Sequence, residues 1–490
     1  MKQDDLKRLI KIEDRINRIA RDDLGLEYPD IEYDVVDDKK LLELMAYIIP
    51  TNFSHWTHGR DYDKIRTIHE KVEANLPLEM VINCVPARAY LSNVNTVGVN
   101  SLVMAHVVGH VHHFTVNKYF NSRRLDIVEF LARASERFSR YERQYGIEEV
   151  EPIIDAGLSL RYHSNPWDNE TDTEKRERLF EQHKRANVKV HTEFSEFFEN
   201  DDREIIEDID LHNSKLWRQL KNTVPVEPTE DFLRFIIDNS KYLDDWQKDI
   251  LEVNREVGRY FYANIHNKLM AEGVATFIHQ KIIKKLYEEG HLTNEDYSQY
   301  IYSNSMVRYQ NPFQINPYYV GCGLLEDIED RWNKGRHGED WDQCTSIRDR
   351  ENWDTKANAG HQKVLEVMKS YNDWYILQDF LTEDVIDKLD LYIYEQVEIR
   401  DEIQLRRTNH TPAEIREMIV TVYAHSPFPN IVITSGVDIL EMHHNYFGME
   451  LDKKYTKETM THLFKIWGRS VTLKTIANDA EVLYTVERKL

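Results

Sequence analysis

The chain has 490 residues, of which 41% are hydrophobic and 30% charged, and this composition is typical of an ordered, helix-rich protein with two or three packed subdomains. Its net charge of −23 repels phosphate backbones and anionic lipids, which argues against broad binding to nucleic acids or membrane surfaces. Three widely separated cysteines argue against a disulfide framework or a thiolate zinc site. Neither a secretory signal nor a membrane span is visible, so a soluble, cytoplasmic protein is expected.

The first part of the chain is predicted to be mostly helical. Apolar residues recur at helical spacing in segments 6–19 and 40–49. Two short apolar runs, at 80–83 and 87–91, predict a strand pair at the edge of the helical core. From residue 101 to about residue 120 there is no proline, and apolar residues recur every three or four positions. This pattern predicts a largely buried helix.

The rest of the chain divides by composition. Residues 169–213 are dense in charged side chains and predict solvated helix and connecting loop. Helical patterns resume at 229 and run to about 422, interrupted by a loop at 303–323 that is rich in Asn, Pro and Tyr. The last stretch alternates short apolar runs with one helix.

We therefore predict a mainly α fold: a large helical domain with a short strand pair, followed by a small C-terminal α+β domain. The predicted parts are an N-terminal helical part, a charged solvated insertion, a second helical part and the α+β domain, at 1–165, 166–228, 229–410 and 411–490.

The predicted helix at 101–120 carries a pair of histidines. His106 and His110 are four residues apart, so their imidazoles lie on one helix face and can bind the same cation. Chance alone predicts about one such pair among 21 histidines in 490 residues, so the spacing by itself is weak. Burial strengthens it, because imidazole nitrogens on an apolar helix need partners. His113 lies near the same face, whereas His112 points about 120° away.

A second apolar helix carries Glu272 and, seven residues later on the same face, His279. If the two helices face each other, three histidines and one glutamate match the ligands that zinc, iron and manganese prefer. The metallopeptidase helix His-Glu-x-x-His carries its general base where this chain has Val107, so a base must come from elsewhere. The other interpretation is a hydrogen-bonded network that holds the helices in register, which spacing alone favours by roughly two to one.

Several segments, in order and spacing, carry a resemblance to a known family. They include IPTNFSHW at 49–56, EMVIN at 79–83, AHVVGH at 105–110, KLMAEG at 268–273 and NPY at 316–318. Together they resemble the stage V sporulation protein R (SpoVR) family over most of residues 1–350, and more loosely beyond. The resemblance implies a mostly helical protein linked to spore cortex formation in spore formers.

The resemblance also implies functional residues. The family's site residues match this sequence at His106, His110, Glu272 and His279. His55 and Trp56 match as residues that line the site. The family usually has Asp at the position of His112, and a histidine there is a poorer base for the same task.

Two functions compete at this point. The first is a metal-dependent hydrolase of peptide or amide bonds, motivated by the ligand types and by the link to peptidoglycan-rich cortex. Its cofactor is expected to be a divalent metal, zinc in first place, with iron or manganese as alternatives. The second is a non-catalytic adaptor or regulator with a structural His/Glu cluster, motivated by the family's association with a serine protein kinase. The residues assigned are Glu272 and His112 as catalytic, His106, His110, Glu272 and His279 as metal ligands, and His55, Trp56 and His113 as site-lining.

Overall fold

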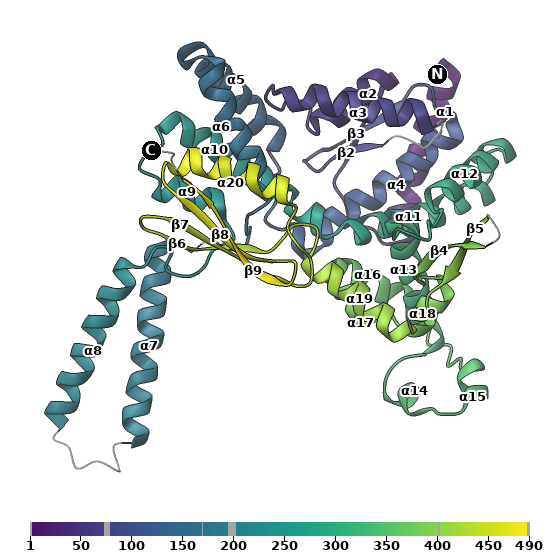
Figure 1. The fold of residues 1–490 in the computed structure, drawn as a ribbon. Coiled ribbons are helices and arrows are strands. Elements are labelled where there is room, and N and C mark those ends of the chain that lie inside the picture. The colour runs from purple at the N-terminus through teal and green to yellow at the C-terminus, as the bar shows by residue number, and fades with distance from the viewer. Residues whose placement is uncertain (1, 73–78, 169, 195–201, 400–401, 488–490) are drawn as a thin grey trace. The chain divides into compact units, whose positions relative to one another are not determined.

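The computed structural model describes all residues except 1, 73–78, 169, 195–201, 400–401 and 488–490. The described chain is mainly helical, with three small sheets, as predicted (Figure 1). It divides into two compact units. Unit 1 comprises Met1–Glu136 and Ala263–Pro427, and unit 2 comprises Arg137–Tyr262 and Phe428–Leu490. The four parts predicted from the sequence stay a prediction.

Unit 1 holds most of the helices and two of the sheets. Its helices are α1 (Gln3–Arg18), α2 (Asp38–Tyr47), α3 (Trp56–Val72), α4 (Val97–Val116), the start of α5 (Ile127–Tyr145), α11 (Lys268–Glu288), α12 (Asn294–Val307), α13 (Pro317–Lys334), α14 (Glu339–Gln343), α15 (Ile347–Glu351), α16 (Gly360–Ser370), α17 (Asp373–Phe380), α18 (Glu383–Lys388) and α19 (Pro412–His425). A π-helical turn and a 3-10 turn follow α1 and α4, at Ile19–Asp23 and Lys118–Phe120. Its strands are β1 (Ile31–Val36), β2 (Met80–Ile82), β3 (Ala87–Ser92), β4 (Tyr394–Ile399) and β5 (Glu402–Arg407).

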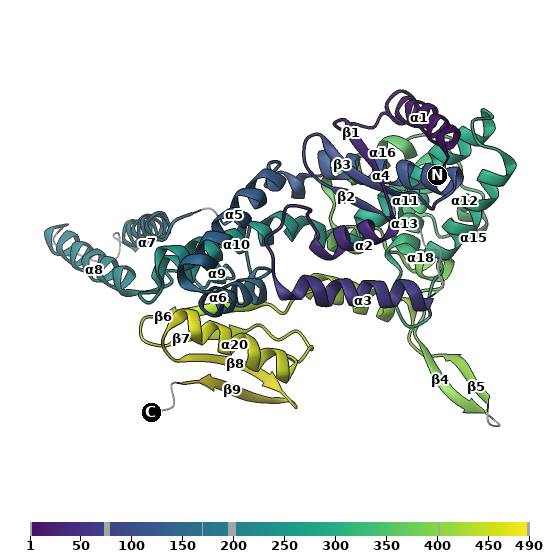
Figure 2. The same cartoon turned by 90° about the horizontal axis from the view of Figure 1, so that it is seen from above.

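The predicted strand pair is the antiparallel pair β2–β3, in which Met80 lies opposite Tyr90. Strand β1, which the sequence analysis did not predict, adds in parallel on the other side of β3. The hairpin β4–β5, also not predicted, projects from the helices of unit 1 (Figure 2). Alternating charged and apolar residues on the hairpin leave both of its faces mostly exposed, so it lacks the buried face that marks a strand in sequence.

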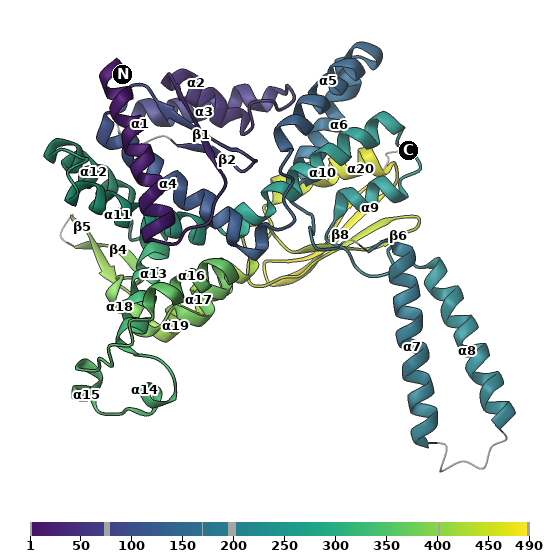
Figure 3. The same cartoon turned by 180° about the vertical axis from the view of Figure 1, so that it is seen from behind.

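Helix α4 lies at the centre of unit 1, against α11, and α11 packs in turn on α13 (Figure 3). Thr96 caps the start of α4 by accepting a hydrogen bond from the amide of Val99, and nearly every residue of the helix is buried. A helix that is apolar all round can only be stable inside a core. The two helices approach closely where Gly109 meets Ala275, because a β-carbon on Gly109 would lie 2.6 Å from the α-carbon of Ala275.

Unit 2 combines helices with the C-terminal sheet. Its helices are the end of α5, α6 (Ile147–Leu160), α7 (Asp172–Phe194), α8 (Asp202–Asn222), α9 (Phe232–Asn239), most of α10 (Asp245–His266) and α20 (Lys453–Trp467). The sheet has the order β6-β7-β8-β9, with strands at Ile431–Gly436, Leu440–His444, Val471–Ala477 and Ala480–Val486. Helix α20 packs on this sheet, which gives the predicted α+β arrangement. Helices α7 and α8 form a hairpin that extends from the other helices of unit 2 (Figure 1).

Among the described residues, no helix combines the length and apolar character that crossing a bilayer requires.

Candidate metal centre

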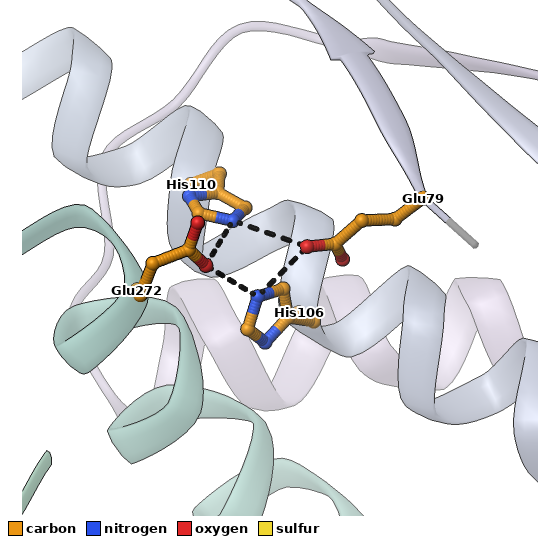
Figure 4. A group of neighbouring side chains, drawn as sticks. All are labelled: Glu79, His106, His110 and Glu272. Atoms are coloured by element: carbon orange, nitrogen blue, oxygen red, sulfur yellow. Dashed lines mark ion pairs between the residues drawn. The ribbon is translucent and has the colours of Figure 1, made fainter. Parts of the chain in front are cut away.

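Four side chains from three segments of unit 1 converge on one point (Figure 4). Helix α4 supplies His106 and His110, one turn apart, and α11 supplies Glu272 from the facing helix. The fourth residue, Glu79, directly precedes β2, and its carboxylate points toward the two histidines of α4. The candidate site is therefore built from two core helices and one strand end.

The distances between the four groups fit a shared cation better than direct pairing. His106 Nε2 lies 3.3 Å from Glu79 Oε1 and 3.5 Å from Glu272 Oε2. His110 Nε2 lies 3.6 Å and 3.4 Å from the same two atoms. Charge-assisted hydrogen bonds are shorter, at about 2.7–2.9 Å. Ligands about 2.0–2.1 Å from a tetrahedral zinc ion lie about 3.3–3.4 Å apart, which matches the four distances.

Burial leaves some of these polar atoms without partners. His106 and His110 are 4% and 5% exposed, and the side chains of Glu79 and Glu272 are 24% and 17% exposed. Among the described residues, neither His106 Nε2 nor Glu272 Oε2 has a hydrogen-bond partner. An unpaired buried polar atom costs free energy. A bound ion would explain why His106 Nε2 and Glu272 Oε2 face each other without partners.

The charges of the two histidines and the two glutamates can balance one another. Burial lowers the pKa of His110, but the neighbouring carboxylates of Glu272 and Glu79 outweigh this effect and raise that pKa to about 10. The pKa of His106 is raised in the same way, against the effect of burial. Burial raises the pKa of Glu272, yet the two histidines lower it to about 2, and they hold the pKa of Glu79 well below its usual range. Without a metal, the two imidazoles can each hold an extra proton against the two carboxylates, and one divalent cation could replace these two protons without changing the net charge.

Three more side chains surround the group. His279, on α11, places its Nδ1 atom 2.8 Å from Nδ1 of His106, and its Nε2 atom lies 3.0 Å from Oδ1 of Asn304, on α12. Tyr318, in the first turn of α13, stacks on the His106 ring with centroids 5.9 Å apart. Burial, the charges of Glu272 and Glu79 and a hydrogen bond to Glu272 raise the pKa of its phenol. A small cavity of about 40 Å³ borders the group and is lined by Glu79, Leu102, Val103, His106, His279, Asn304, Val307 and Tyr318.

The structure brings together three of the four predicted metal ligands, His106, His110 and Glu272, and adds Glu79. His279 contacts His106 but does not belong to this group of four. The ligand roles themselves stay predictions.

The other predicted site residues lie elsewhere in unit 1. The Nδ1 atom of His112 accepts a hydrogen bond from the amide of Glu27 at 3.1 Å, and burial lowers the pKa of this imidazole to about 4. His113 is fully buried, with its ring against Phe120, and burial lowers its pKa to about 3. His55 contacts the hydroxyl of Thr57 at 2.9 Å, and Trp56 is 52% exposed. None of these four residues lines the cavity, so the roles given to them stay untested predictions.

Glu79, Asn304 and Tyr318 were not predicted as site residues. Glu79 and Tyr318 lie within two of the segments that carry the family resemblance, EMVIN and NPY, and that was the available signal. Nothing in the spacing of the sequence links either residue to His106, because chain folding alone brings them together. Asn304 lies in no such segment.

Comparison with known proteins places the chain beside one family. A family model described as SpoVR like protein matches residues 3–427. The uncharacterized protein YcgB of Escherichia coli (strain K12) is similar over nearly the whole length, with 27% identity across 511 aligned positions that cover 96% of this chain and 91% of YcgB. No solved structure matches.

Proposed function

The chain belongs to the SpoVR-like family, and from this premise we propose that it binds a divalent metal ion through Glu79, His106, His110 and Glu272 and uses it to hydrolyse a peptide or amide bond. One observation carries the proposal. The four distances between histidine nitrogens and carboxylate oxygens, 3.3–3.6 Å, are close to those between ligands of a tetrahedral ion, and two of these atoms are buried without any hydrogen-bond partner among the described residues.

The donor chemistry favours zinc, with iron or manganese as alternatives. Two imidazoles and two carboxylates form a nitrogen and oxygen set that all three metals accept, whereas magnesium and calcium prefer oxygen alone. None of the three cysteines belongs to the group, so a thiolate metal site is not part of the proposal.

A bound divalent metal would polarise a substrate carbonyl and lower the pKa of a water taken up as a fifth ligand, because zinc can expand its coordination beyond four. The side chains have separate parts in this chemistry. Glu79 borders the cavity and is the more exposed of the two carboxylates, so it is best placed to accept a proton from an incoming water. Glu272 does not line the cavity and its side chain is only 17% exposed, which favours a fixed ligand role. Glu79 would then supply the base that is missing at Val107.

The proposed substrate class is an amide of the kind found in peptidoglycan stem peptides. The family's link to spore cortex formation motivates this choice, and a cytoplasmic chain would act on precursors of the polymer. The cavity beside His106 and Glu79 has room for a water or a group of similar size next to the metal ligands.

Metal analysis of the purified, reconstituted protein tests the binding step. We expect one zinc, iron or manganese per chain in the wild type, and loss of the metal in His106→Ala and Glu272→Gln. Hydrolysis of peptidoglycan fragments by the loaded protein tests the chemistry, and Glu79→Gln should reduce the rate more than it reduces metal content. A wild-type protein that takes up none of the three metals would refute the proposal.

A second candidate function rests on the charge balance of the group. Two imidazolium ions and two carboxylates can neutralise each other without a metal, so the cluster would then only hold α4, α11 and β2 together. In that case the protein is an adaptor or regulator, with a serine protein kinase as the expected partner. Capture of that kinase by a wild type that binds no metal, and by His106→Ala equally well, favours this alternative.

A further inference from the structure

A row of two hydrogen bonds runs from the candidate metal centre to helix α12 of unit 1. It begins at His106 Nδ1, which lies 2.8 Å from His279 Nδ1, and continues from His279 Nε2 to Asn304 Oδ1 at 3.0 Å. The two histidines are 4% and 2% exposed. The row therefore connects a predicted ligand on α4 to α11 and α12 without passing through bulk solvent.

The protons in this row can be placed by elimination. One proton must lie between the two Nδ1 atoms, because two bare nitrogens at 2.8 Å would repel each other. If it belonged to His279, a neutral ring would turn a bare Nε2 toward Asn304 Oδ1, and two acceptors would face each other at 3.0 Å. Burial disfavours a charged His279, whose direct partners include no carboxylate.

With both rings neutral, one arrangement satisfies the two contacts of the row. His106 carries its proton on Nδ1 and donates it to His279, and His279 carries its own on Nε2 and donates it to Asn304. When a metal takes the place of the second proton, Nε2 of His106 offers it a lone pair, and Nε2 is the atom that faces Glu79 and Glu272. This is the tautomer that a metal ligand needs.

We propose that His279 and Asn304 are positioning residues, which fix the Nδ1–H tautomer and the ring orientation of His106, and that His279 is not itself a metal ligand. This inference rests on the proposed metal-binding function and names the residues that orient His106 for it. It replaces the ligand role predicted for His279 with a contact one shell further out. His110 lacks such a partner, since its Nδ1 atom is buried without a hydrogen bond among the described residues. The tautomer is therefore fixed by a hydrogen bond at His106 and not at His110.

Cobalt(II) titration of the metal-free protein separates a ligand from a positioning residue, because the visible bands of bound Co²⁺ report its ligand set. The variants are His279→Leu and Asn304→Leu, which break the row, and Asn304→Asp, which keeps an acceptor in place. Loss of a positioning contact to a metal ligand lowers metal affinity about 10–100-fold. We expect that loss for both leucine variants, with bands of unchanged shape, and near wild-type affinity for Asn304→Asp at pH 8.

His444→Leu is the matched control. His444 is a buried histidine of unit 2 whose Nδ1 atom makes a 2.8 Å contact with Thr475 Oγ1, so its loss removes a comparable bond far from the ligands in sequence. It should lower stability and leave the cobalt affinity unchanged.

Each outcome decides one question. Altered bands in His279→Leu would make His279 a ligand and overturn the inference. Unchanged affinity in both leucine variants would also overturn it, because the row would then be structural only. Weakened binding in Asn304→Asp would reverse the direction of the protons, since a carboxylate cannot donate. A wild type that binds no Co²⁺ or Zn²⁺ would instead refute the proposed function.

Discussion

Two buried clusters of charged side chains, one in each unit, differ in how completely they pair. In unit 2, Arg255 and Asp231 are both 3% exposed, and three contacts of 2.9–3.1 Å join the guanidinium to the two carboxylate oxygens. Asp231 also caps α9 by accepting a hydrogen bond from the amide of Arg234. In unit 1, the shortest contact between a histidine and a carboxylate of the candidate centre is 3.3 Å.

The difference separates a structural ion pair from a binding site. A buried ion pair is stable when short, well-oriented hydrogen bonds satisfy its polar atoms, and Arg255 with Asp231 meets that condition. The His/Glu group of unit 1 does not, because its donor atoms surround a point rather than bond to one another. Polar atoms that remain unpaired at the spacing of metal ligands are better explained by a bound ion than by pairing with one another.

The largest expected effect is on the paired cluster. Arg255→Met leaves the Asp231 carboxylate buried without its cation, which should lower the free energy of unfolding by about 3–5 kcal/mol. Chemical denaturation followed by circular dichroism measures it. Arg234→Met is the control, because that side chain is 46% exposed where it pairs with Asp238 and should cost less than about 1 kcal/mol. A small effect of Arg255→Met would remove the contrast between the two clusters.

Asp373 tests a third kind of buried charge, one that accepts hydrogen bonds from backbone amides. It is 5% exposed, and its two oxygens accept hydrogen bonds from the amides of Leu269 and Met270, in the first turn of the helix that carries Glu272. Burial raises its pKa from 3.8 to about 7, although those amides act in the opposite direction.

Because the folded pKa lies above the unfolded one, the folded state holds this proton more tightly. Its stabilising contribution is complete below about pH 4 and is lost as the pH rises through about 7, by roughly 4 kcal/mol in all. The stability advantage of the wild type over Asp373→Asn should therefore shrink as the pH increases from 4 to 8. Asp379→Asn, an exposed change on α17, the helix that carries Asp373, should keep the pH dependence of stability seen in the wild type. Parallel pH profiles for the wild type and Asp373→Asn would contradict the prediction.

Metal addition should stabilise only the unpaired cluster. Free zinc at 100 times the dissociation constant should raise the free energy of unfolding by about 2.7 kcal/mol in the wild type. Thermal unfolding at fixed pH, with and without zinc, measures this gain. Glu272→Gln should abolish it, whereas Arg255→Met should lower the melting temperature and keep the gain intact. An equal zinc response in Glu272→Gln would mean that zinc binds elsewhere.

Periodicity and composition predicted the main features of the fold. The unbroken apolar pattern predicted α4, and two short apolar runs predicted the strands that pair as β2 and β3. Strand β1 was missed because it alternates acidic and apolar residues over only six positions and gains its stability from pairing with β3. The hairpin β4–β5 was missed for the related reason that it buries no continuous face. Both failures come from elements whose stability is set by their neighbours.

The candidate site was predictable only where one helix carries the residues. Helical spacing placed His106 with His110, and a second helix supplied Glu272, but no spacing rule connects Glu79 to them across the intervening residues. The same limit applies to His279. Its position on the predicted face made it a ligand candidate, and only side-chain geometry shows it bonded to the far nitrogen of His106. Sequence periodicity therefore locates a site to a helix face, and packing decides which atoms meet.

The smallest effect on stability is expected at the contact between α4 and α11. A change there also tests most directly whether the His/Glu group is a binding site rather than a structural ion pair. Gly109 lies between the two histidines, and a β-carbon there would come within 2.6 Å of the backbone of Ala275. Gly109→Ala should force the helices apart at a cost of about 1–3 kcal/mol, since the overlap is with backbone rather than with a flexible side chain. The same shift moves His106 and His110 away from Glu272, so zinc affinity should fall although no ligand is changed. Zinc competition with a chromogenic chelator measures that fall. Gly59→Ala, on α3 in open space, is the matched control. If Gly109→Ala lowered stability and left zinc affinity unchanged, the spacing of α4 and α11 would not set the geometry of the centre, and the 3.3–3.6 Å distances would lose their meaning as a ligand cage.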